Sequence, residues 1–192
     1  MAAKSTLRNM VLCLTAVCLL CSAILGVVYA VTFEPIKAAD KANLEASLSE
    51  VVPEGATVQT EPEVLTAGGN SYECYRATDA NGELCATAVK STVNGFGGAL
   101  TVLVGINSDG TVCAAKVLSH SETPGLGAKC EDNASAFVSQ FRGFDPSQKT
   151  LSVRKDGGDV DAITASTITS RAYTLAIANA VELLKNEEAC NE

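Results

Sequence analysis

The sequence predicts an α+β fold in which a single N-terminal transmembrane helix precedes a domain with a mostly antiparallel sheet flanked by helices. Three observations predict it. Residues 9–33 form an uncharged apolar run, strand-like segments follow in pairs around turn-rich connections, and a long helical pattern closes the chain. Hairpins with helices set apart from them are typical of α+β domains. We expect an anchor at 1–34, a connecting helix at 35–56 and a globular domain at 57–190.

The N-terminal segment has the length and composition of a membrane helix. Lys4 and Arg8 precede the apolar run. At a rise of about 1.5 Å per residue the run reaches about 37 Å, which is enough to cross a hydrocarbon core of about 30 Å. A positive start followed by an apolar run is typical of an export signal, so we place the domain outside the cytoplasm.

A retained anchor is favoured over two other readings of this segment. A cleaved signal peptide has a plausible cleavage site at Val28–Ala30, but the apolar run exceeds the usual core of about 7–15 residues. A lipoprotein site is disfavoured because Leu20, before Cys21, is bulkier than the residue such sites require.

The polar, helix-favouring segment from Pro35 to Glu50 predicts a short helix that Pro53–Gly55 ends. Strands then follow in two hairpins, each closed by a turn rich in Asp, Asn and Gly. The four predicted strands are Ser71–Thr78, Glu83–Lys90, Leu100–Ile106 and Thr111–Leu118. We also expect a helix at Ala134–Phe141 and a strand at Thr150–Val153.

A hydroxyl-rich segment leads into the closing helix. An apolar stripe from Tyr173 to Leu184 recurs at helical spacing, so the hydroxyls lie at or within the first helical turn. Free N–H groups and the positive end of the helix dipole favour an anion there. Ser and Thr are also ordinary helix caps, so the residues alone leave both a phosphate-type ligand and an elaborate cap open. The hydroxyls belong to Thr164, Ser166, Thr167, Thr169 and Ser170.

Two glycine clusters and the overall charge narrow the function classes. Gly95–Gly98 precedes a strand and Pro124–Gly127 follows one, which suits either close approach to a ligand or plain turns. Neither is a dinucleotide fingerprint or a phosphate-binding loop, so nicotinamide and ATP binding have no support. The net charge of −8 argues against nucleic acid as a partner.

Three motifs resemble those of a known family. Asp161–Thr169 resembles the flavinylation motif Asp-x-x-Ser/Thr-Gly-Ala-Ser/Thr-x-Ser/Thr, whose last hydroxyl, here Thr169, carries FMN through a phosphoester. One departure is that Ala165–Ser166 stands where Gly-Ala is commonest. His120–Gly127 resembles the family's His-x-Glu-Thr-Pro-Gly-Leu-Gly segment, and Gly95–Gly98 its Gly-Tyr-Gly-Gly turn. Along the chain the motifs follow an N-terminal anchor in the order Gly95–Gly98, His120–Gly127 and Asp161–Thr169. In this order they resemble those of the G subunit of the Rnf electron-transport complex.

The resemblance implies a function and a location. The domain at 57–190 would bind FMN covalently on the periplasmic, extracytoplasmic side of the inner membrane, as a single-pass protein. A flavin transferase would attach the FMN, and the partners would be the other membrane subunits and membrane lipid. The chain would be a one-electron carrier in an ion-translocating ferredoxin:NAD oxidoreductase rather than a complete enzyme.

The resemblance also implies which residues hold the cofactor. Thr169 is the attachment point, and the other hydroxyls of the segment surround the phosphate. Two further groups approach the isoalloxazine ring and the ribityl chain. The phosphate neighbours are Thr164, Ser166, Thr167 and Ser170. The first further group is Glu122, Thr123, Leu126 and Gly127, and the second is Gly97 and Gly98.

His120 and the cysteines are given structural roles. His120 is the only histidine, so a zinc site is not expected, and we expect it to shape the turn before Glu122. Eight cysteines are present, three of them inside the apolar run. In the first hairpin we expect Cys74 opposite Thr87 rather than Cys85, so no cross-strand disulfide is predicted and free thiols are the expectation.

Three alternatives stay open. One is a stand-alone anchored flavoprotein that serves an extracytoplasmic reductase. Another is the C subunit of the sodium-pumping NADH:quinone oxidoreductase, a relative with extra segments for which this chain has little room. The third is a non-redox binding domain whose hydroxyl-rich segment only caps a helix.

Overall fold

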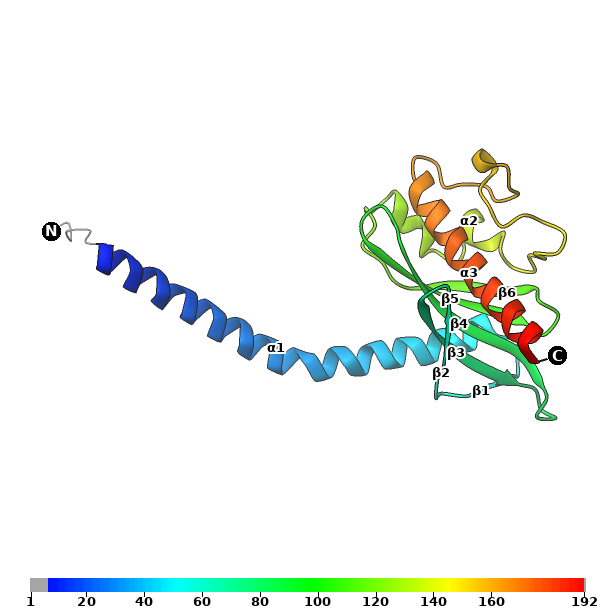
Figure 1. The fold of residues 1–192 in the computed structure, drawn as a ribbon, viewed down its shortest axis with the longest axis horizontal. Coiled ribbons are helices and arrows are strands. Elements are labelled where there is room, and N and C mark those ends of the chain that lie inside the picture. Colours follow the sequence, from blue (N-terminus) through cyan, green and yellow to red (C-terminus); the bar gives the residue numbers. More distant parts are fainter. Residues whose placement is uncertain (1–6, 192) are drawn as a thin grey trace. The chain divides into compact units, whose positions relative to one another are not determined.

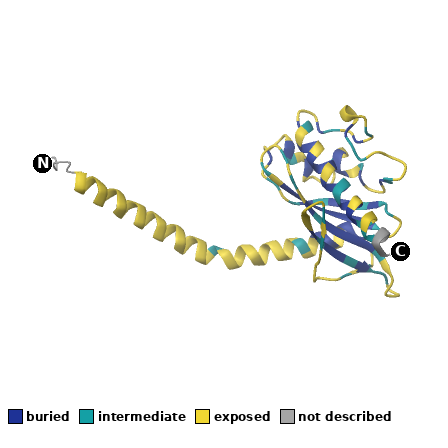
Figure 2. Cartoon of the chain, in the orientation of Figure 1, coloured by how far each residue is buried: buried dark blue, intermediate teal, exposed yellow. Residues whose placement is uncertain are grey.

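The structure is a computed structural model that describes residues 7–191, with side chains through residue 187. The chain divides into two compact units between Asn43 and Leu44. The first helix, α1 (Leu7–Val51), contains Pro35 and runs without interruption through the expected boundary between anchor and connecting helix. Its most apolar 18-residue window has a mean hydropathy of 2.8, and its side chains in the first unit are almost all exposed (Figure 2). By length and composition α1 can therefore cross a membrane.

The second unit is built on one antiparallel sheet. The strand order is β1–β3–β4–β5–β6, and β2 pairs with β3 beside β1 (Figure 1). The four long strands confirm the two predicted hairpins, whereas β1 and β2 were not predicted. The strands are β1 (Thr57–Val58), β2 (Glu63–Ala67), β3 (Asn70–Thr78), β4 (Leu84–Asn94), β5 (Ala99–Asn107) and β6 (Val112–Ser119).

The two predicted hairpin turns close through their aspartates. Asp79 Oδ1 accepts hydrogen bonds from the N–H groups of Glu83 and Asn81 at 3.0 and 2.8 Å. In the second turn, Asp109 Oδ1 accepts from the hydroxyl and the N–H of Thr111 at 2.6 and 2.8 Å. These hydrogen bonds favour the charged carboxylates and lower the pKa of both aspartates.

Both faces of the sheet are covered. β5 is buried along almost its whole length, because Val102 and Val104 face the core beneath α3 (Thr167–Asn191) while Leu103 faces the core beneath the last turns of α1. Burial on both faces explains why this strand is a near-continuous apolar run. A Cβ at Gly105 would collide with the Val51 carbonyl, so glycine lets α1 lie directly against β5.

The strand predicted at Thr150–Val153 is wrong. Val153 forms only an isolated bridge with Val160, and the segment is a compact loop in which the Thr150 N–H donates to Asp159 at 2.8 Å. A Cβ at Gly158 would overlap the Ser152 carbonyl. The chain therefore doubles back on itself here instead of extending along the sheet.

The helix predicted at Ala134–Phe141 is much shorter in the structure. It is the single turn α2 (Ala136–Ser139), and Ser135 caps it by accepting the Val138 N–H at 3.2 Å. The loops that follow β6 and α2 also contain two short 3₁₀ helices, η1 (Gly127–Cys130) and η2 (Arg154–Asp156).

The expected pairing of Cys74 with Thr87 is also wrong. Cys74 lies opposite Val89, because Thr78 pairs with Leu84 and a register shift between Ala77 and Thr78 displaces the partner strand by one residue more. The cysteines whose side chains the structure describes, from Cys13 to Cys130, are free thiols. Burial raises the pKa of Cys74 to about 12.

Candidate functional site

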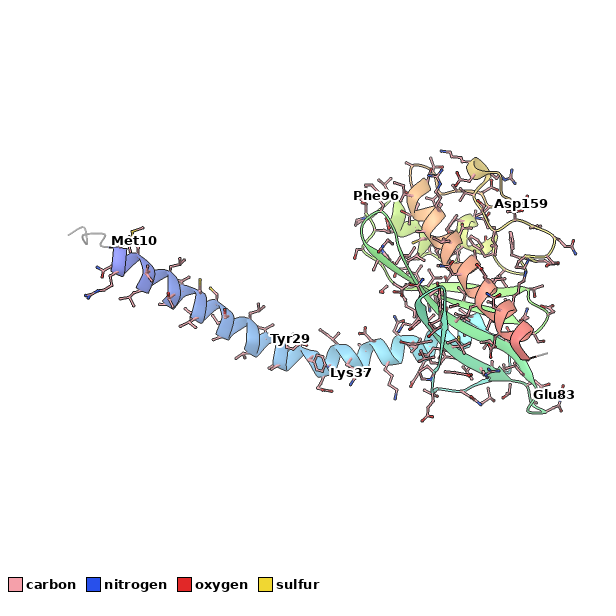
Figure 3. The ribbon with its side chains drawn as sticks, in the orientation of Figure 1. Met10, Tyr29, Lys37, Glu83, Phe96 and Asp159 are labelled. Carbon is pink, nitrogen blue, oxygen red and sulfur yellow. The ribbon has the colours of Figure 1, made fainter. Side chains whose placement is uncertain are left out.

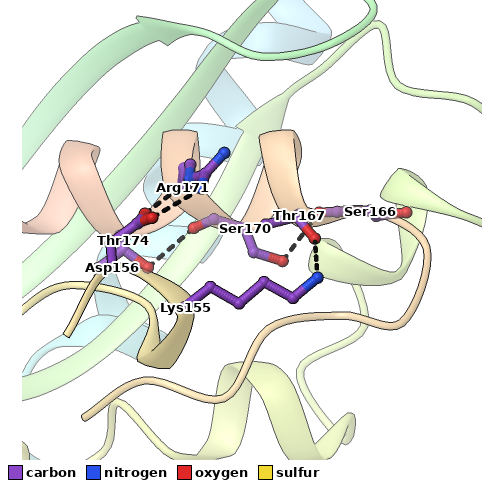
Figure 4. Close-up of polar contacts among 7 residues, drawn as sticks. All are labelled: Lys155, Asp156, Ser166, Thr167, Ser170, Arg171 and Thr174. Atoms are coloured by element: carbon purple, nitrogen blue, oxygen red, sulfur yellow. Dashed lines mark hydrogen bonds and ion pairs between the residues drawn. The ribbon is translucent and has the colours of Figure 1, made fainter. Parts of the chain in front are cut away.

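The first turn of α3 is closed by Ser166 and Ser170. The Ser166 carbonyl accepts hydrogen bonds from the N–H and the hydroxyl of Ser170 at 3.0 and 2.9 Å (Figure 4). The Ser170 hydroxyl oxygen in turn accepts from the Ile163 N–H at 2.9 Å. Ser170 is fully buried, so its hydroxyl satisfies the loop that enters the helix.

The same loop passes through a left-handed conformation at Ala165. Its φ is 63°, and no other non-glycine residue within 7–191 has a positive φ. Glycine takes this conformation without the steric cost that a Cβ imposes. This geometry explains why the motif that the segment resembles commonly has glycine at that position.

Thr169 is held by a buried carboxylate. Its hydroxyl donates to Glu122 Oε2 at 2.8 Å, and the two residues are only 1% and 6% exposed. Glu122 Oε1 accepts from the backbone N–H groups of Phe96 and Gly97 at 2.8 and 3.4 Å. One side chain thus joins the β4–β5 turn, the loop after β6 and the first turn of α3.

Two glycines leave the space that this carboxylate occupies. A Cβ at Gly127 would lie 2.6 Å from Glu122 Oε2 and 2.8 Å from the Thr169 hydroxyl oxygen. A Cβ at Gly95 would overlap Glu122 Oε1. Both glycines belong to the glycine clusters singled out in the sequence, and here they are required by close packing around one pair of side chains.

His120 shapes the turn before Glu122, as predicted. Its Nδ1 accepts the Glu122 N–H at 3.1 Å, and its Nε2 lies 3.1 Å from Glu131 Oε2. Because Nδ1 is the acceptor, Nε2 carries the proton and donates to Glu131. Both ring nitrogens are therefore used in fixing the backbone that presents Glu122.

A cavity of about 380 Å³ opens beside Thr169, within the range of about 300–1,000 Å³ typical of cofactor pockets. Its apolar wall is formed by Phe96, Leu126 and Ile168, which expose 67%, 44% and 50% of their surfaces. Phe96 lies at the tip of the β4–β5 turn (Figure 3). Its other wall is lined by the hydroxyls of the first helical turn and by Glu122.

The loop containing η2 brings a cation to this helix end. Lys155 Nζ lies 3.4 Å from the Thr167 hydroxyl (Figure 4). The neighbouring Arg171 donates from Nε and an Nη to the two carboxylate oxygens of Asp156 at 2.6 and 2.7 Å. The Arg171 guanidinium lowers the pKa of Asp156. Arg171 is thus paired, whereas the Lys155 ammonium points to a hydroxyl on the cavity wall.

The predicted site residues divide into two sets. Thr164 is exposed, Ser170 belongs to the helix cap, and Gly97 and Gly98 pack against Ser121; none of the four lines the cavity. Those that do line it are Glu122, Thr123, Leu126, Gly127, Ser166, Thr167 and Thr169.

Sequence reasoning missed four residues at the site. Phe96 lies inside the first glycine cluster, so an exposed aromatic at a turn was an available signal. Ala165 and Ile168 lie inside the hydroxyl-rich segment but bear no polar group, and they line the cavity. Lys155 carried no signal, because only the folded loop brings it to Thr167.

A larger cavity, of about 540 Å³, borders the C-terminal half of α3. Arg76 lies on its wall and donates to Glu63 at 2.9 Å and to Glu187 at 2.6 Å. These charged groups are therefore paired with one another.

Comparison with known proteins places the site in a family. Residues 95–182 match the FMN-binding domain family, a range that contains the β4–β5 turn, Glu122 and Thr169. Three relatives are named as the G subunit of an ion-translocating oxidoreductase complex. That of Vibrio vulnificus (strain YJ016) is 35% identical, over 80% of this chain and 77% of its own. Those of Shewanella piezotolerans (strain WP3) and Pseudoalteromonas atlantica (strain T6c) are 34% and 36% identical, over 91% and 93% of this chain and 87% and 88% of theirs.

A solved structure, that of Shewanella oneidensis NqrC, is 24% identical, covers 65% of this chain and 62% of its own, and has a TM-score of 0.47. Within residues 7–191, α1 is the one helix long and apolar enough to span a membrane, as in a single-pass membrane protein. With relatives about 35% identical that align over most of its length, this chain belongs to the family of G subunits of ion-translocating oxidoreductase complexes.

Proposed function

We propose that this chain carries FMN esterified through its phosphate to Thr169 and passes electrons within a membrane-bound, Rnf-type ion-translocating ferredoxin:NAD oxidoreductase complex. One observation carries the proposal: the Thr169 hydroxyl lies at the start of α3 on the wall of a cavity of about 380 Å³. The FMN-binding family match covers this cavity, and the relatives' shared name supports the place in a complex.

The residues around Thr169 fit the phosphate end of FMN. The first-turn N–H groups of a helix have no partner within the helix, and the dipole favours a negative group there. The Ser166 and Thr167 side chains line the same wall, and Lys155 lies beside Thr167. Amides, hydroxyls and one ammonium are the groups that bind phosphate oxygens in proteins.

The apolar wall fits the ring end. Phe96, Leu126 and Ile168 are exposed in the chain alone, and a planar aromatic ring placed among them would remove apolar surface from water. When bound, FMN supplies one-electron redox chemistry. The chain's residues hold its phosphate, orient its ring and limit the access of water.

The Thr169 hydroxyl is better suited to form the phosphoester with FMN than the neighbouring hydroxyls are. Ser170 is buried in the helix cap, where its hydroxyl both donates and accepts. Thr167 lines the cavity but its hydroxyl is next to Lys155, so it is suited to binding a phosphate oxygen. Thr169 alone among them donates to a buried carboxylate.

The location and the partners complete the proposal. The FMN domain, residues 57–190, lies on the periplasmic side of the inner membrane, behind the anchor at 1–34 and the connecting helix at 35–56. A flavin transferase loads it, and membrane lipid and the other subunits of the complex surround its anchor. Co-purification with several very hydrophobic subunits tests this assembly, and recovery of the holoprotein alone from native membranes would instead favour a stand-alone anchored flavoprotein.

Intact mass of the denatured protein tests the attachment. The full chain is expressed with a flavin transferase as wild type, Thr169→Ala and Thr164→Ala, the last being a control because Thr164 is exposed and does not line the cavity. We expect the mass of FMN minus water on the wild type and the control, and no added mass on Thr169→Ala. An unmodified wild type would refute covalent attachment, and an adduct on Thr169→Ala would move the acceptor to Thr167 or Ser170.

A further inference from the structure

We infer that Glu122 positions the Thr169 hydroxyl for esterification and accepts its proton when the phosphoester forms. The inference rests on the proposed function and describes how the same site is loaded. It assigns Glu122 a role before and during attachment, in addition to lining the completed site.

The first support is the direction of the hydrogen bond. A hydroxyl has one proton and two lone pairs, and the Thr169 proton is directed at Glu122 Oε2 across 2.8 Å. Among the described residues no group donates a hydrogen bond to this oxygen, and Thr169 lines the cavity. A separation of 2.8 Å lies within the reach of about 2.6–3.2 Å that a general base requires.

The second support is the balance of the reaction. When the co-reactant is FAD, a bond forms between the Thr169 oxygen and the phosphorus nearer the riboflavin, and the bond from that phosphorus to the bridging oxygen breaks, so that AMP leaves. Nothing is oxidised or reduced. The hydroxyl proton has to leave the Thr169 oxygen, and Glu122 Oε2 already accepts its hydrogen bond.

The third support is the electrostatics of the product. A phosphodiester is an anion, and a deprotonated Glu122 beside it would repel it with little screening, because this carboxylate is itself only 6% exposed. A Glu122 that has taken the proton donates a hydrogen bond to the phosphate instead. Its Oε1 meanwhile stays on the Phe96 and Gly97 amides, so the side chain keeps its place through the reaction.

The other titratable groups around Glu122 have different partners. His120 uses Nδ1 for the Glu122 amide and Nε2 for Glu131. Burial, reinforced by the Glu122 charge, raises the pKa of Cys130 to about 11 and keeps this thiol neutral. Lys155 bonds to Thr167. Among the described residues, Glu122 is the one whose side chain is hydrogen-bonded to the Thr169 hydroxyl.

Adduct formation by the full chain in detergent, with purified flavin transferase and saturating FAD, tests the inference. The rate of mass increase is measured against chain concentration for wild type, Glu122→Gln and Glu122→Asp. Gln keeps an oxygen for the Phe96 and Gly97 amides but cannot accept a proton. We expect kcat to fall at least about 100-fold in Glu122→Gln with the KM for the chain unchanged, and Asp to recover part of the rate.

The control is Glu182→Gln, which removes the charge of an exposed glutamate on α3 that does not line the cavity; it should react at the wild-type rate. A wild-type kcat in Glu122→Gln, or a change in its KM alone, would overturn the inference while leaving covalent FMN intact. Absence of an adduct on wild type would overturn the proposed function and this inference together. Should thermal unfolding show that the Gln variant does not fold, Glu122→Asp decides: a lowered kcat at unchanged KM supports the role, and an unchanged kcat refutes it.

Discussion

The two ends of α3 border two cavities that differ in what their walls still offer to a ligand. The one at the C-terminal half, about 540 Å³, is the larger, yet its Arg76 is bonded to both Glu63 and Glu187. The one at the N-terminal end, about 380 Å³, is lined by Ser166, Thr167 and Thr169 of the helix start and by the buried carboxylate that accepts the Thr169 hydrogen bond. The comparison shows that the two cavities differ in the chemistry of their walls, a helix start with hydroxyls and a carboxylate against an ion-paired surface, and that volume does not separate them in the same way.

The helix dipole also makes the N-terminal end of α3 the better site for an anionic ligand. An anion is stabilised at the N-terminus of a helix by about 0.3–1 kcal/mol at an exposed site, and a cation at the C-terminus. Only the N-terminal end of α3 can therefore favour the phosphate of FMN through its backbone.

Among the variants that compare the two ends of α3, Gly127→Ala should have the largest effect. In Gly127→Ala the new methyl group would lie 2.6 Å from Glu122 Oε2 and 2.8 Å from the Thr169 oxygen, so the pair has to separate. We expect adduct formation under flavin transferase to slow at least about tenfold, the loss that roughly 1.4 kcal/mol of transition-state stabilisation produces. The matched control is Gly110→Ala on the wall of the other cavity, where a Cβ meets no atom within 4 Å.

Gly110 has a φ of 80°, so Gly110→Ala should lower stability by about 1–2 kcal/mol and leave adduct formation at the wild-type rate. If adduct formation slowed equally in Gly127→Ala and Gly110→Ala, the effect would not be specific to the cavity at the N-terminal end of α3.

Ser170→Ala should separate capping from attachment. Without its hydroxyl, the buried Ile163 N–H loses its partner, and an unsatisfied buried donor costs about 1–3 kcal/mol. We expect the free energy of unfolding in urea to fall by that amount while the FMN adduct persists. Loss of the adduct from a folded Ser170→Ala would instead make Ser170 part of the attachment chemistry.

Ala165→Gly should raise stability slightly. A Cβ at a φ of 63° destabilises the folded state by about 1–2 kcal/mol. Glycine in turn lowers stability by about 0.4–1 kcal/mol, because it raises the entropy of the unfolded chain. The net gain is therefore between about 0 and about 1.6 kcal/mol, measurable as a higher melting temperature. A lower melting temperature would show that the loop prefers alanine for a reason other than its backbone angle.

The smallest expected effect concerns acid stability at the N-terminal end. Arg171 holds the pKa of Asp156 below its ordinary 3.8, so this pair stabilises the fold above that pH and the contribution is lost as pH falls through the lowered value. Asp156→Asn should therefore slightly reduce the free energy of unfolding at neutral pH. The variant should also lose less of that free energy than the wild type when the pH falls below 3.8. Because the pair is on the surface, the change is small.

Glu187→Gln at the other end of α3 is the counterpart, since Arg76 keeps its bond to Glu63. It should change neither adduct formation nor the acid dependence that Asp156 produces. Unfolding curves at several pH values compare the two variants.

The sequence predicted what local chemistry determines. The hairpins followed from turn residues such as Asp79 and Asp109, and the start of α3 followed from a hydroxyl segment before an apolar stripe. β2 was missed because Glu63–Ala67 is a short, partly exposed edge strand, which lacks a clear alternation. Thr150–Val153 was mistaken for a strand because its composition suits one, although the following loop folds back onto it.

In the site, too, the local sequence indicates single residues but does not show how the fold brings them together. The resemblance to known motifs singled out Glu122 and Thr169 separately, but the hydrogen bond between them joins residues 47 positions apart and depends on how the loops pack. Lys155 shows the limit most clearly, because its approach to Thr167 is set by the loop that contains η2 and leaves no trace in the local sequence.

The end of α1 is both the exit from the membrane helix and part of the interior of the globular unit. Leu48, Val51 and Val52 are buried against the sheet, and Gly105 in β5, which has no side chain, leaves room for Val51. A protease that cut after these residues would strip one side of the sheet as well as releasing the protein from its tether. A fragment that keeps this packing therefore has to include Leu48, Val51 and Val52.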